Sequence, residues 1–147
     1  MIEKIKHRMA LLKEVAPQSV GVMLDLKLLG YDELRQEYIL QGKTFSWMQN
    51  GHGTLHGGFV ATFADHAMGL VSNCVLTGDG VAPAIELHMN YHRPLIPGED
   101  VLIRVRLRSV TKSLLHTSAE LFRASAPDKL CASGQATYFY KPKVTDR

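Results

Sequence analysis

The chain has 147 residues, of which 46% are hydrophobic, 21% charged and 7% aromatic. This composition is typical of one globular domain, long enough to bury roughly 70% of the surface that its unfolded chain would expose. Disordered and collagen-like proteins are excluded, because the apolar content is high and the 12 Gly and 6 Pro follow no period. The formal net charge of +3 is too small for a protein that coats nucleic acid.

Cysteine usage and hydropathy indicate a cytoplasmic protein. Cys74 and Cys131 are too few for a disulfide framework or a four-ligand zinc site, and their apolar neighbours are typical of structural thiols in a reducing compartment. Asp65 and His66 interrupt the longest apolar run before it reaches the roughly 18 uncharged residues that a membrane span needs. Charges within residues 1–6 interrupt the apolar core that a signal peptide requires.

The first third of the chain predicts a helix followed by two strands. Apolar residues recur at helical spacing before Pro17 stops the run, and they are Ile2, Ile5, Met9, Leu12 and Ala16. We expect this short amphipathic helix to lie on the body of the protein. Residues 20–28 and 34–40 alternate well enough for two strands, which a turn at residues 30–32 would join.

A glycine-rich stretch, residues 50–58, opens into the most helix-like segment of the chain. This central helix is predicted over residues 59–76 and ends near residues 77–78. It carries an apolar stripe at i, i+3, i+4 spacing, which comprises Phe59, Phe63, Ala67, Leu70, Val71 and Cys74.

The second half of the chain is nearly all strand. Four segments are predicted as strands, namely residues 85–91, 101–108, 114–123 and 130–140. Pro94, Pro97 and Gly98 mark the turn between the first two, and residues 126–128 form the turn between the last two. Short connections favour antiparallel neighbours, and the long helix needs an apolar surface to cover it. We therefore predict an α+β fold in which an antiparallel sheet wraps around one central helix, as a single domain over residues 1–147.

The central helix also carries a carboxylate away from its apolar stripe. Asp65 lies on another face, where its neighbours one turn away carry no charge, and these are Ala61, Thr62, Met68 and Gly69. Small neighbours let a ligand or another backbone approach closely. Asp65 therefore either serves a functional site or pairs with a group across a subunit contact.

Two glycines at the start of this helix predict a site for a negative charge. Gly57 and Gly58 place free backbone N–H groups at the positive end of the helix dipole. Such donors bind a phosphate or stabilise the oxyanion that forms when a carbonyl is attacked, and the loop lacks the Gly-Lys-Ser/Thr ending of a P-loop. With Asp65 a short distance along the helix, the arrangement would suit hydrolysis of an activated carbonyl without a metal or organic cofactor.

Other polar residues have simpler interpretations. His52 and His56 are spaced like metal ligands, but their glycine-rich loop is not helical, so we expect no metal site. Arg104, Arg106 and Arg108 form an alternating row, which we interpret as the solvated face of a strand, with binding of substrate phosphates as the second interpretation and RNA binding as the third.

Two motifs resemble those of a known family. The first is Asn50-x-x-Gly53-Thr54-Leu55-His56-Gly57-Gly58, followed after six residues by Asp65. The second is Asn90-Tyr91-His92-Arg93-Pro94, followed by Pro97-Gly98-Glu99-Asp100. Together with the predicted strand order, they resemble the hotdog-fold thioesterases of the PaaI (phenylacetate-pathway) type, within the 4-hydroxybenzoyl-CoA thioesterase superfamily.

The resemblance implies a hotdog dimer, usually paired into a tetramer, whose active sites are shared between two subunits. Asp65 matches the catalytic carboxylate, which acts as general base or nucleophile, and Gly57 matches the residue whose N–H polarises the thioester carbonyl. His56 matches a histidine that orients the loop or contacts the thioester. Asn50 matches a residue that helps to hold the attacking water across the interface.

Further positions match the substrate-binding part of the family pattern. Arg93 and Lys112 fall where members often place basic residues near the coenzyme A phosphates, and Gly58 adds a second backbone donor. Members commonly carry Ser or Thr on the strand that faces the helix, where this chain has Ala84. Alanine supplies no hydroxyl, and Thr62, on the same helix face as Asp65, is a candidate to replace it.

The sequence therefore predicts an acyl-CoA thioesterase that forms a homo-oligomer and has neither a nucleic-acid nor a membrane partner. Two alternatives remain open, a non-catalytic acyl-CoA-binding module and an acyl-thioester hydratase or dehydratase on the same scaffold. The sequence does not identify the acyl group, and both an aryl-acetyl group and a medium-chain fatty acyl group are compatible with it.

Overall fold

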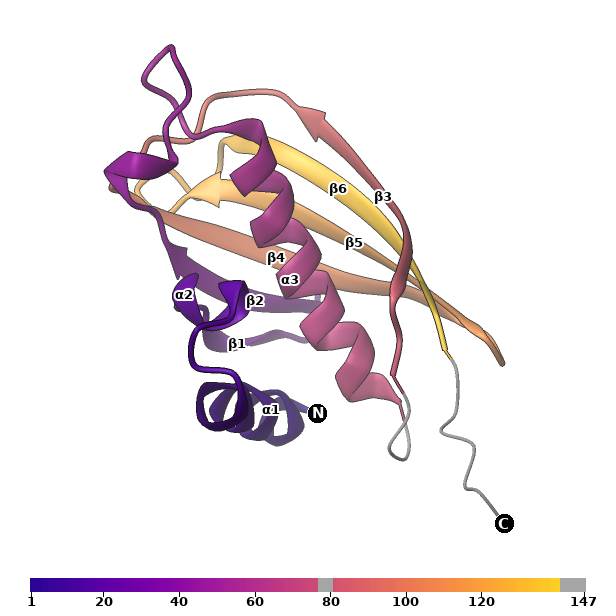
Figure 1. Cartoon of the computed structure of the whole chain (residues 1–147). Coiled ribbons are helices and arrows are strands. Elements are labelled where there is room, and N and C mark those ends of the chain that lie inside the picture. The colour runs from indigo at the N-terminus through magenta and orange to yellow at the C-terminus, as the bar shows by residue number, and fades with distance from the viewer. Residues whose placement is uncertain (77–80, 141–147) are drawn as a thin grey trace.

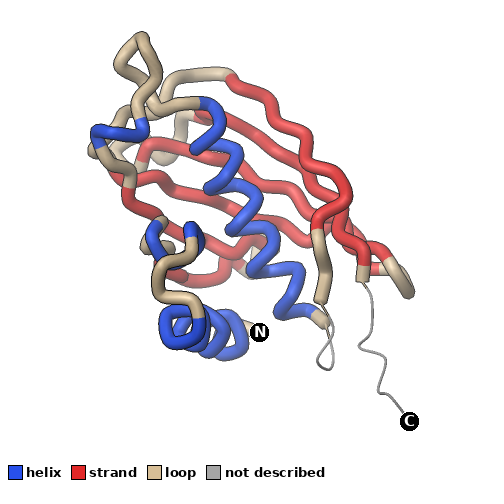
Figure 2. The backbone as a smooth tube through the Cα atoms, viewed as in Figure 1, coloured by secondary structure: helices blue, strands red, loops and turns tan. Residues whose placement is uncertain are grey.

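The computed structural model describes residues 1–76 and 81–140, where a curved sheet is covered on one face by a long helix (Figures 1 and 2). The elements are α1 (Ile2–Val15), α2 (Val20–Met23), β1 (Lys27–Asp32), β2 (Glu37–Lys43), a 3-10 turn (Ser46–Met48), α3 (Gly57–Val75), β3 (Ala84–Tyr91), β4 (Asp100–Val110), β5 (Leu114–Arg123) and β6 (Leu130–Phe139). The predicted α+β class is confirmed, and α1 packs against α3 and β1 as the amphipathic pattern suggested. The predicted helix end at residues 77–78 lies outside the described residues. No helix in the described ranges is long and apolar enough to cross a membrane.

The sheet is antiparallel and has the strand order β1-β2-β4-β5-β6-β3. Strands β4, β5 and β6 form a meander, but β3 lies at the edge beside β6 and not beside β4 (Figure 1). The interpretation of residues 94–98 as a turn between neighbouring strands is therefore wrong. These residues belong to a connection across three strand spacings, roughly 14 Å, which a short extended segment can cover.

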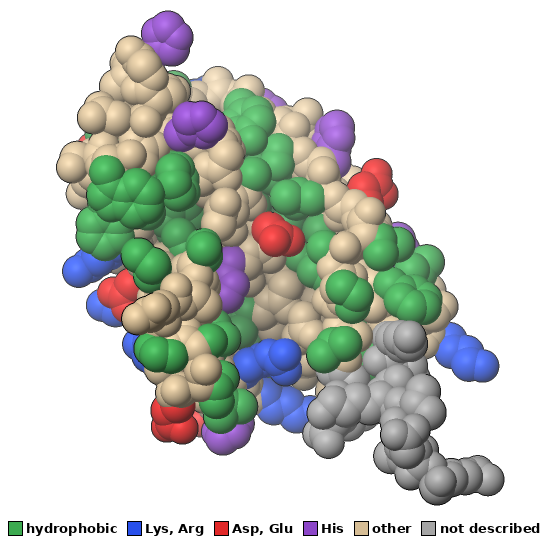
Figure 3. Space-filling model, viewed as in Figure 1, with side chains coloured by type: hydrophobic (Ala, Val, Ile, Leu, Met, Phe, Trp, Pro, Cys, Tyr) green, Lys and Arg blue, Asp and Glu red, His purple; other side chains and the backbone are tan. Residues whose placement is uncertain are grey.

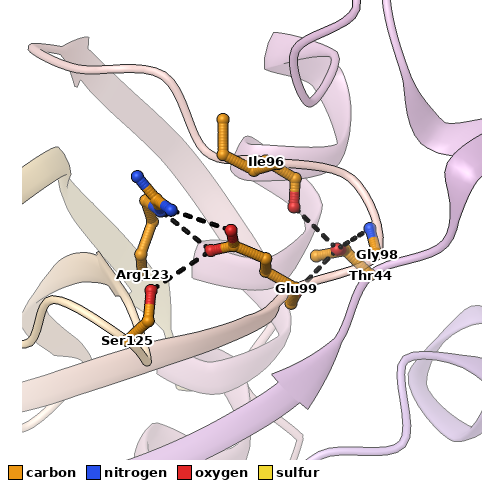
Figure 4. A network of polar contacts seen from close by, with 6 residues as sticks. All are labelled: Thr44, Ile96, Gly98, Glu99, Arg123 and Ser125. Atoms are coloured by element: carbon orange, nitrogen blue, oxygen red, sulfur yellow. Dashed lines mark hydrogen bonds and ion pairs between the residues drawn. The ribbon is translucent and has the colours of Figure 1, made fainter.

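A polar network holds that connection at the end of the sheet (Figure 4). Arg123 donates from Nε and Nη2 to the two carboxylate oxygens of Glu99, each at 2.8 Å. The buried Thr44 hydroxyl donates to the Glu99 carbonyl at 2.6 Å and accepts the Gly98 N–H at 2.9 Å. Gly98 has a φ of 89°, a left-handed conformation that glycine adopts without strain. The motif around Gly98 and Glu99 therefore defines the path from β3 to β4.

The core lies between α3 and the sheet. The predicted apolar stripe of α3 is buried except for Phe59, which is half-buried. Opposite it, three residues of β4 are fully buried, namely Val101, Ile103 and Val105. Phe63 lies over Gly42 of β2, where a Cβ would come within 2.6 Å of the ring. A larger residue at position 42 would force Phe63 out of its place. Cys74 and Cys131 are free and buried, as predicted.

The prediction of a strand over residues 20–28 is wrong in its first half. Residues 20–23 form α2, and β1 begins only at Lys27. Between them Asp25 has a φ of 46°, a left-handed conformation that Asp tolerates better than most residues. The turn also falls after residues 30–32, where the Asp32 carboxylate accepts the Arg35 N–H at 3.0 Å. Local bonds of this kind compete with regular structure and leave no trace in hydrophobic periodicity.

The interpretation of the basic row on β4 as a solvated face is wrong for two of its members. Arg106 forms an ion pair with Glu37 of β2, whose side chain is buried. Arg104 lies over the Phe122 ring, 4.6 Å from its centroid. Neighbouring strands supply these partners, and spacing within one strand does not reveal them.

Candidate active site

The glycine-rich loop leaves one backbone donor unused at the start of α3. His56 is the N-cap, and its Nδ1 accepts the Gly58 N–H at 2.9 Å. The N–H groups of Phe59 and Val60 both donate to the His56 carbonyl. Within the described residues, no hydrogen bond from the Gly57 N–H is found. This donor therefore lies at the positive end of the α3 dipole, open to a ligand.

Asn50 organises the loop ahead of this helix. Its Oδ1 accepts two backbone N–H groups of its own loop, at 2.9 and 3.2 Å, and its Nδ2 donates to the Thr54 hydroxyl at 2.8 Å. The amide has a second N–H, and the side chain is only half-buried. Asn50 and Gly57 line one cavity of about 370 Å³, together with Tyr91 and Arg93. The structure thus brings three of the predicted site residues together.

Tyr91 connects the edge strand β3 to the start of α3. Its hydroxyl donates to the Gly57 carbonyl at 2.9 Å. A Cβ at Gly57 would come within 3.4 Å of the Tyr91 ring, so the two residues are in close contact. In the sequence Tyr91 belongs to the second motif, and its strand position, two residues after Met89, places both side chains on the same face.

Asp65 lines a different cavity. It lies eight residues after Gly57 on α3, which corresponds to about 12 Å along the helix axis. The second cavity has a volume of about 490 Å³, and its apolar lining includes Leu11, Leu12 and Val15 of α1 and Leu70 of α3. One chain therefore does not bring Asp65 together with Gly57 and Asn50, and the resemblance had implied a site shared between two subunits.

A tyrosine that the sequence analysis missed contacts the Asp65 carboxylate. The Tyr138 hydroxyl lies 3.4 Å from Asp65 Oδ1 and 3.2 Å from the Asp65 carbonyl oxygen. Burial, and then the Asp65 charge, raise the pKa of Tyr138 well above its ordinary value, so the phenol is a donor at neutral pH. The one signal for this role in the sequence is that residue 138 is aromatic and lies on the helix-facing side of the predicted strand.

The Thr62 hydroxyl, the candidate to replace the one that Ala84 lacks, is bonded within its own helix. The Thr62 hydroxyl donates to the Gly58 carbonyl at 2.8 Å, so its proton is engaged within α3. The N–H of Gly58 is likewise engaged, by His56. Ala84 lies opposite Tyr138 in the register of β3 and β6, and both line the cavity of Asp65.

The two basic residues predicted near coenzyme A lie far apart. Arg93 donates from Nη1 to the Leu130 carbonyl at 2.8 Å, at the start of β6. Lys112 lies in the turn between β4 and β5, next to Leu114, which pairs with Phe139 at the other end of β6. A ten-residue strand spans roughly 30 Å, so one chain does not place both residues on the same phosphates.

His52 and His56 are spaced like metal ligands in the sequence, but no metal site was predicted there. His52 is exposed in the loop, and the Nδ1 of His56 is engaged by the Gly58 N–H. In residues 1–76 and 81–140, no group of three or more His, Cys, Asp or Glu side chains is arranged to hold a metal ion.

Comparison with known proteins places the chain in a family. The sequence profile of the thioesterase superfamily matches residues 52–130, more than half of the chain. The chain belongs to the thioesterase superfamily. Acyl-coenzyme A thioesterase 13 of Homo sapiens is 37% identical over 90 residues, which cover 60% of this chain and 61% of that protein. The chain thus matches less than two thirds of this relative's length.

Solved structures of thioesterase-superfamily proteins share the architecture. A variant of the phenylacetic acid degradation protein PaaI from Thermus thermophilus is 30% identical, with a TM-score of 0.66 over 80% of this chain and 94% of that chain. A Streptococcus mutans protein, solved bound to acetyl-CoA, is 19% identical, with a TM-score of 0.68 over 80% of this chain and 90% of that chain. The hotdog fold implied by the sequence motifs is confirmed.

The segment that matches the thioesterase superfamily does not contain the whole candidate site. Gly57, Asp65 and Arg93 lie inside it. Asn50, Tyr138 and all of α1 lie outside it, although α1 and Tyr138 line the cavity beside Asp65. The surroundings of Asp65 therefore have to be argued from this chain itself.

Proposed function

We propose that this chain hydrolyses acyl-CoA thioesters to a free acid and coenzyme A, with Asp65 as general base or nucleophile and the Gly57 N–H as oxyanion donor. The observation that carries the proposal is the unused Gly57 N–H at the start of α3. Membership of the thioesterase superfamily supports it, as do the name of the human relative and the acetyl-CoA bound to the Streptococcus mutans protein.

The site is completed by a second copy of the chain. About 12 Å separate Asp65 and Gly57 along α3, so one thioester carbonyl cannot touch both residues of a single chain. Strand β3 supports the same arrangement, because it is an unpaired sheet edge whose helix-facing side chains are exposed, Ile85 by 61% and Tyr91 by 56%. Hydrophobic side chains lie open on the β3 side of this face (Figure 3). Pairing of two β3 edges would cover them and bring Asp65 of one copy toward Gly57 of the other.

In the general-base form of the reaction, a water molecule attacks the thioester carbon while Asp65 takes one of its protons. The carbonyl oxygen becomes an oxyanion and accepts the Gly57 N–H. The carbon–sulfur bond then breaks, and the proton passes from Asp65 to the sulfur, which leaves as a thiol. A general base contributes about 10²–10⁴ in rate and an oxyanion donor about 10²–10³, which suffices for an activated ester.

The loop residues orient the reactants. Because Nδ1 of His56 accepts the Gly58 N–H, the neutral ring carries its proton on Nε2 and presents that donor to the substrate. Asn50 holds the loop in shape and has a second amide N–H for the attacking water.

The two cavities divide the substrate between them. We place the coenzyme A phosphates at the Gly57 cavity, where the Arg93 side chain uses one of its five N–H donors on Leu130 and has no other hydrogen bond to the described residues. We place the acyl group in the apolar cavity beside Asp65. Such a lining suits a medium-chain or aromatic acyl group.

Thiol release from a panel of straight-chain and aromatic acyl-CoAs tests the proposal, with Asp65→Asn as the comparison. We expect the variant to lose about a hundredfold or more in kcat while binding of a substrate analogue by calorimetry is retained. Equal rates in both proteins would exclude Asp65 as the reacting group. Binding without thiol release from any ester would favour the acyl-CoA-binding module, and a modified acyl-CoA with no thiol would favour the hydratase.

Subunit mixing tests the shared site. Asp65→Asn and Gly57→Pro should each be inactive alone, because each homodimer lacks one group at both sites. After subunit exchange, half of the dimers are mixed and each has one intact site, so about a quarter of the wild-type activity should return. No recovery, with exchange verified by mass spectrometry, would show that the two groups act from one chain.

A further inference from the structure

We propose that the Tyr138 hydroxyl positions the Asp65 carboxylate for catalysis, an inference that rests on the proposed function of Asp65. Tyr138 lies on β6, 73 residues after Asp65, and only 2% of its surface is exposed. Its oxygen lies 3.2 Å from the Asp65 carbonyl oxygen and 3.4 Å from the carboxylate Oδ1, so both are acceptors for its single proton.

The contact distinguishes the two carboxylate oxygens. Oδ1 is held by the phenol, whereas no hydrogen bond to Oδ2 is found within the described residues. A carboxylate on a helix rotates about two side-chain torsions, and a fixed partner for one oxygen restricts that rotation. Tyr138 therefore holds Oδ1 at the sheet and leaves Oδ2 as the oxygen that meets water or the thioester.

Among the described residues, no other side chain that lines the cavity beside Asp65 has a hydrogen bond to the Asp65 carboxylate. Among the described residues that line the cavity of Asp65, Tyr138 alone carries a hydroxyl, and Ala84 lies opposite it on β3. The other titratable side chains that line the cavity are Arg8 from α1 and His66 from α3. Neither has a hydrogen bond to Asp65 in the described part of the chain.

Close packing restricts the Tyr138 side chain. The Tyr138 ring lies beside Gly69, one turn beyond Asp65, where a Cβ would be 3.6 Å from the hydroxyl oxygen. Because the phenol is buried and faces a carboxylate, its pKa is raised and it stays protonated at neutral pH and below. A donor that does not titrate in this range supports a base without adding a pH limit of its own.

Tyr138→Phe tests the proposal, because it removes one oxygen atom and retains the packed ring. We expect kcat to fall about tenfold, near the lower end for the loss of a hydrogen bond to a charged group, with KM changed less than about twofold. We also expect the acidic limb of the kcat/KM profile to move toward higher pH, because the ionised carboxylate loses a donor. Tyr31→Phe, on the exposed part of β1, is the matched control and should leave both readouts unchanged.

Two further measurements separate positioning from a purely structural role. In the Asp65→Asn background, Tyr138→Phe should cause no additional loss, because the group that it positions is already absent. Replacement of Tyr138 by 3,5-difluorotyrosine retains the hydroxyl and makes it a stronger donor, so the acidic limb should move toward lower pH. The fluorinated protein also serves if Tyr138→Phe fails to fold.

A Tyr138→Phe enzyme with wild-type kcat and an unshifted pH profile would overturn the inference. So would a fall in kcat that is equal in the wild-type and Asp65→Asn backgrounds, since that result indicates a structural defect. If Asp65→Asn itself retains activity, the proposed function of Asp65 fails first, and that outcome is distinct from a failure of Tyr138 alone.

Discussion

His56 caps its own helix, because its Nδ1 accepts the N–H of Gly58 at 2.9 Å. The same bond sets the tautomer of the ring and removes Gly58 as a ligand donor, so Gly57 carries the N–H that remains free. One side chain thus determines which backbone donor is left free of a partner at the start of α3, within the described residues, and which ring nitrogen stays outside the cap.

The cap and the outward nitrogen of His56 can be measured separately. His56→Ala should lower the free energy of unfolding by about 1 kcal/mol, whereas His56→Asn should restore most of it, since asparagine is a good N-cap. Urea denaturation measures the cap, and thiol release measures the ring. If His56→Asn is as stable as wild type but hydrolyses slowly, the Nε2 donor matters to the reaction; full activity in both variants would contradict a role beyond the cap.

Removal of the Gly57 N–H should disable hydrolysis without disturbing the helix. Gly57→Pro places proline at the first position of α3, where it is favoured, after a residue with φ −58° and ψ 133°, which suits a position before proline. We expect kcat to fall about 10²–10³. Gly57→Ala retains the N–H and is the control, although its Cβ approaches Tyr91. A Gly57→Pro enzyme with unchanged circular dichroism and near wild-type kcat would rule out this oxyanion donor.

A charge on the exposed face of β3 should separate the copies. Leu87→Glu places a carboxylate on the helix-facing side of the edge strand, where partner contact would have to desolvate it. We expect a monomer in light scattering and loss of thiol release at the same protein concentration. Leu34→Glu, at a side chain 99% exposed in the turn before β2, is the control and should change neither. An active Leu87→Glu monomer would contradict the shared site.

The α1 wall of the Asp65 cavity should set the length of the acyl group. Leu11→Trp fills part of this cavity from α1, so long acyl chains lose room while short ones do not. Each excluded methylene costs about 0.8 kcal/mol, roughly fourfold in kcat/KM. Rates measured from butanoyl- to dodecanoyl-CoA should therefore fall increasingly with length. Leu29→Trp on β1 is the control. An equal fall in kcat/KM for all chain lengths would contradict the placement of the acyl group in this cavity.

Stability below neutral pH should depend on His66. Burial lowers the pKa of His66 below its ordinary 6.5, and the Asp65 charge opposes this only in part. The unfolded chain then binds a proton more readily than the folded one, so stability is complete above pH 6.5 and falls as the pH drops below it. His66→Gln should flatten that slope in melting temperatures between pH 5 and 7.5, whereas His7→Gln, on the exposed side of α1, should not. A slope unchanged in His66→Gln would assign it to other groups.

Much of this molecule follows from local pattern. The existence of α3, the alternation of β4 and the helix-start glycines depend on residues within one or two turns or a few strand positions, and the structure confirms them, although α3 begins at Gly57, two residues before its predicted start. The first motif likewise identified Gly57 and Asn50, which share a cavity. Local pattern failed at the turn after β1. The Asp32 carboxylate bonds to the nearby Arg35 N–H, and the turn lies several residues later than predicted.

Only the tertiary structure shows which strands are neighbours and how the candidate site residues are distributed between two cavities. Periodicity shows which face of β3 is apolar, but only the pairing with β6 shows that this face is left uncovered at a sheet edge. The Arg106–Glu37 pair and the contact of Tyr138 with Asp65 join segments about 70 residues apart. Neighbours along the chain determine helices and strands, whereas contacts of this range are selected only when the whole sheet closes over α3, because no single segment buries its apolar face alone.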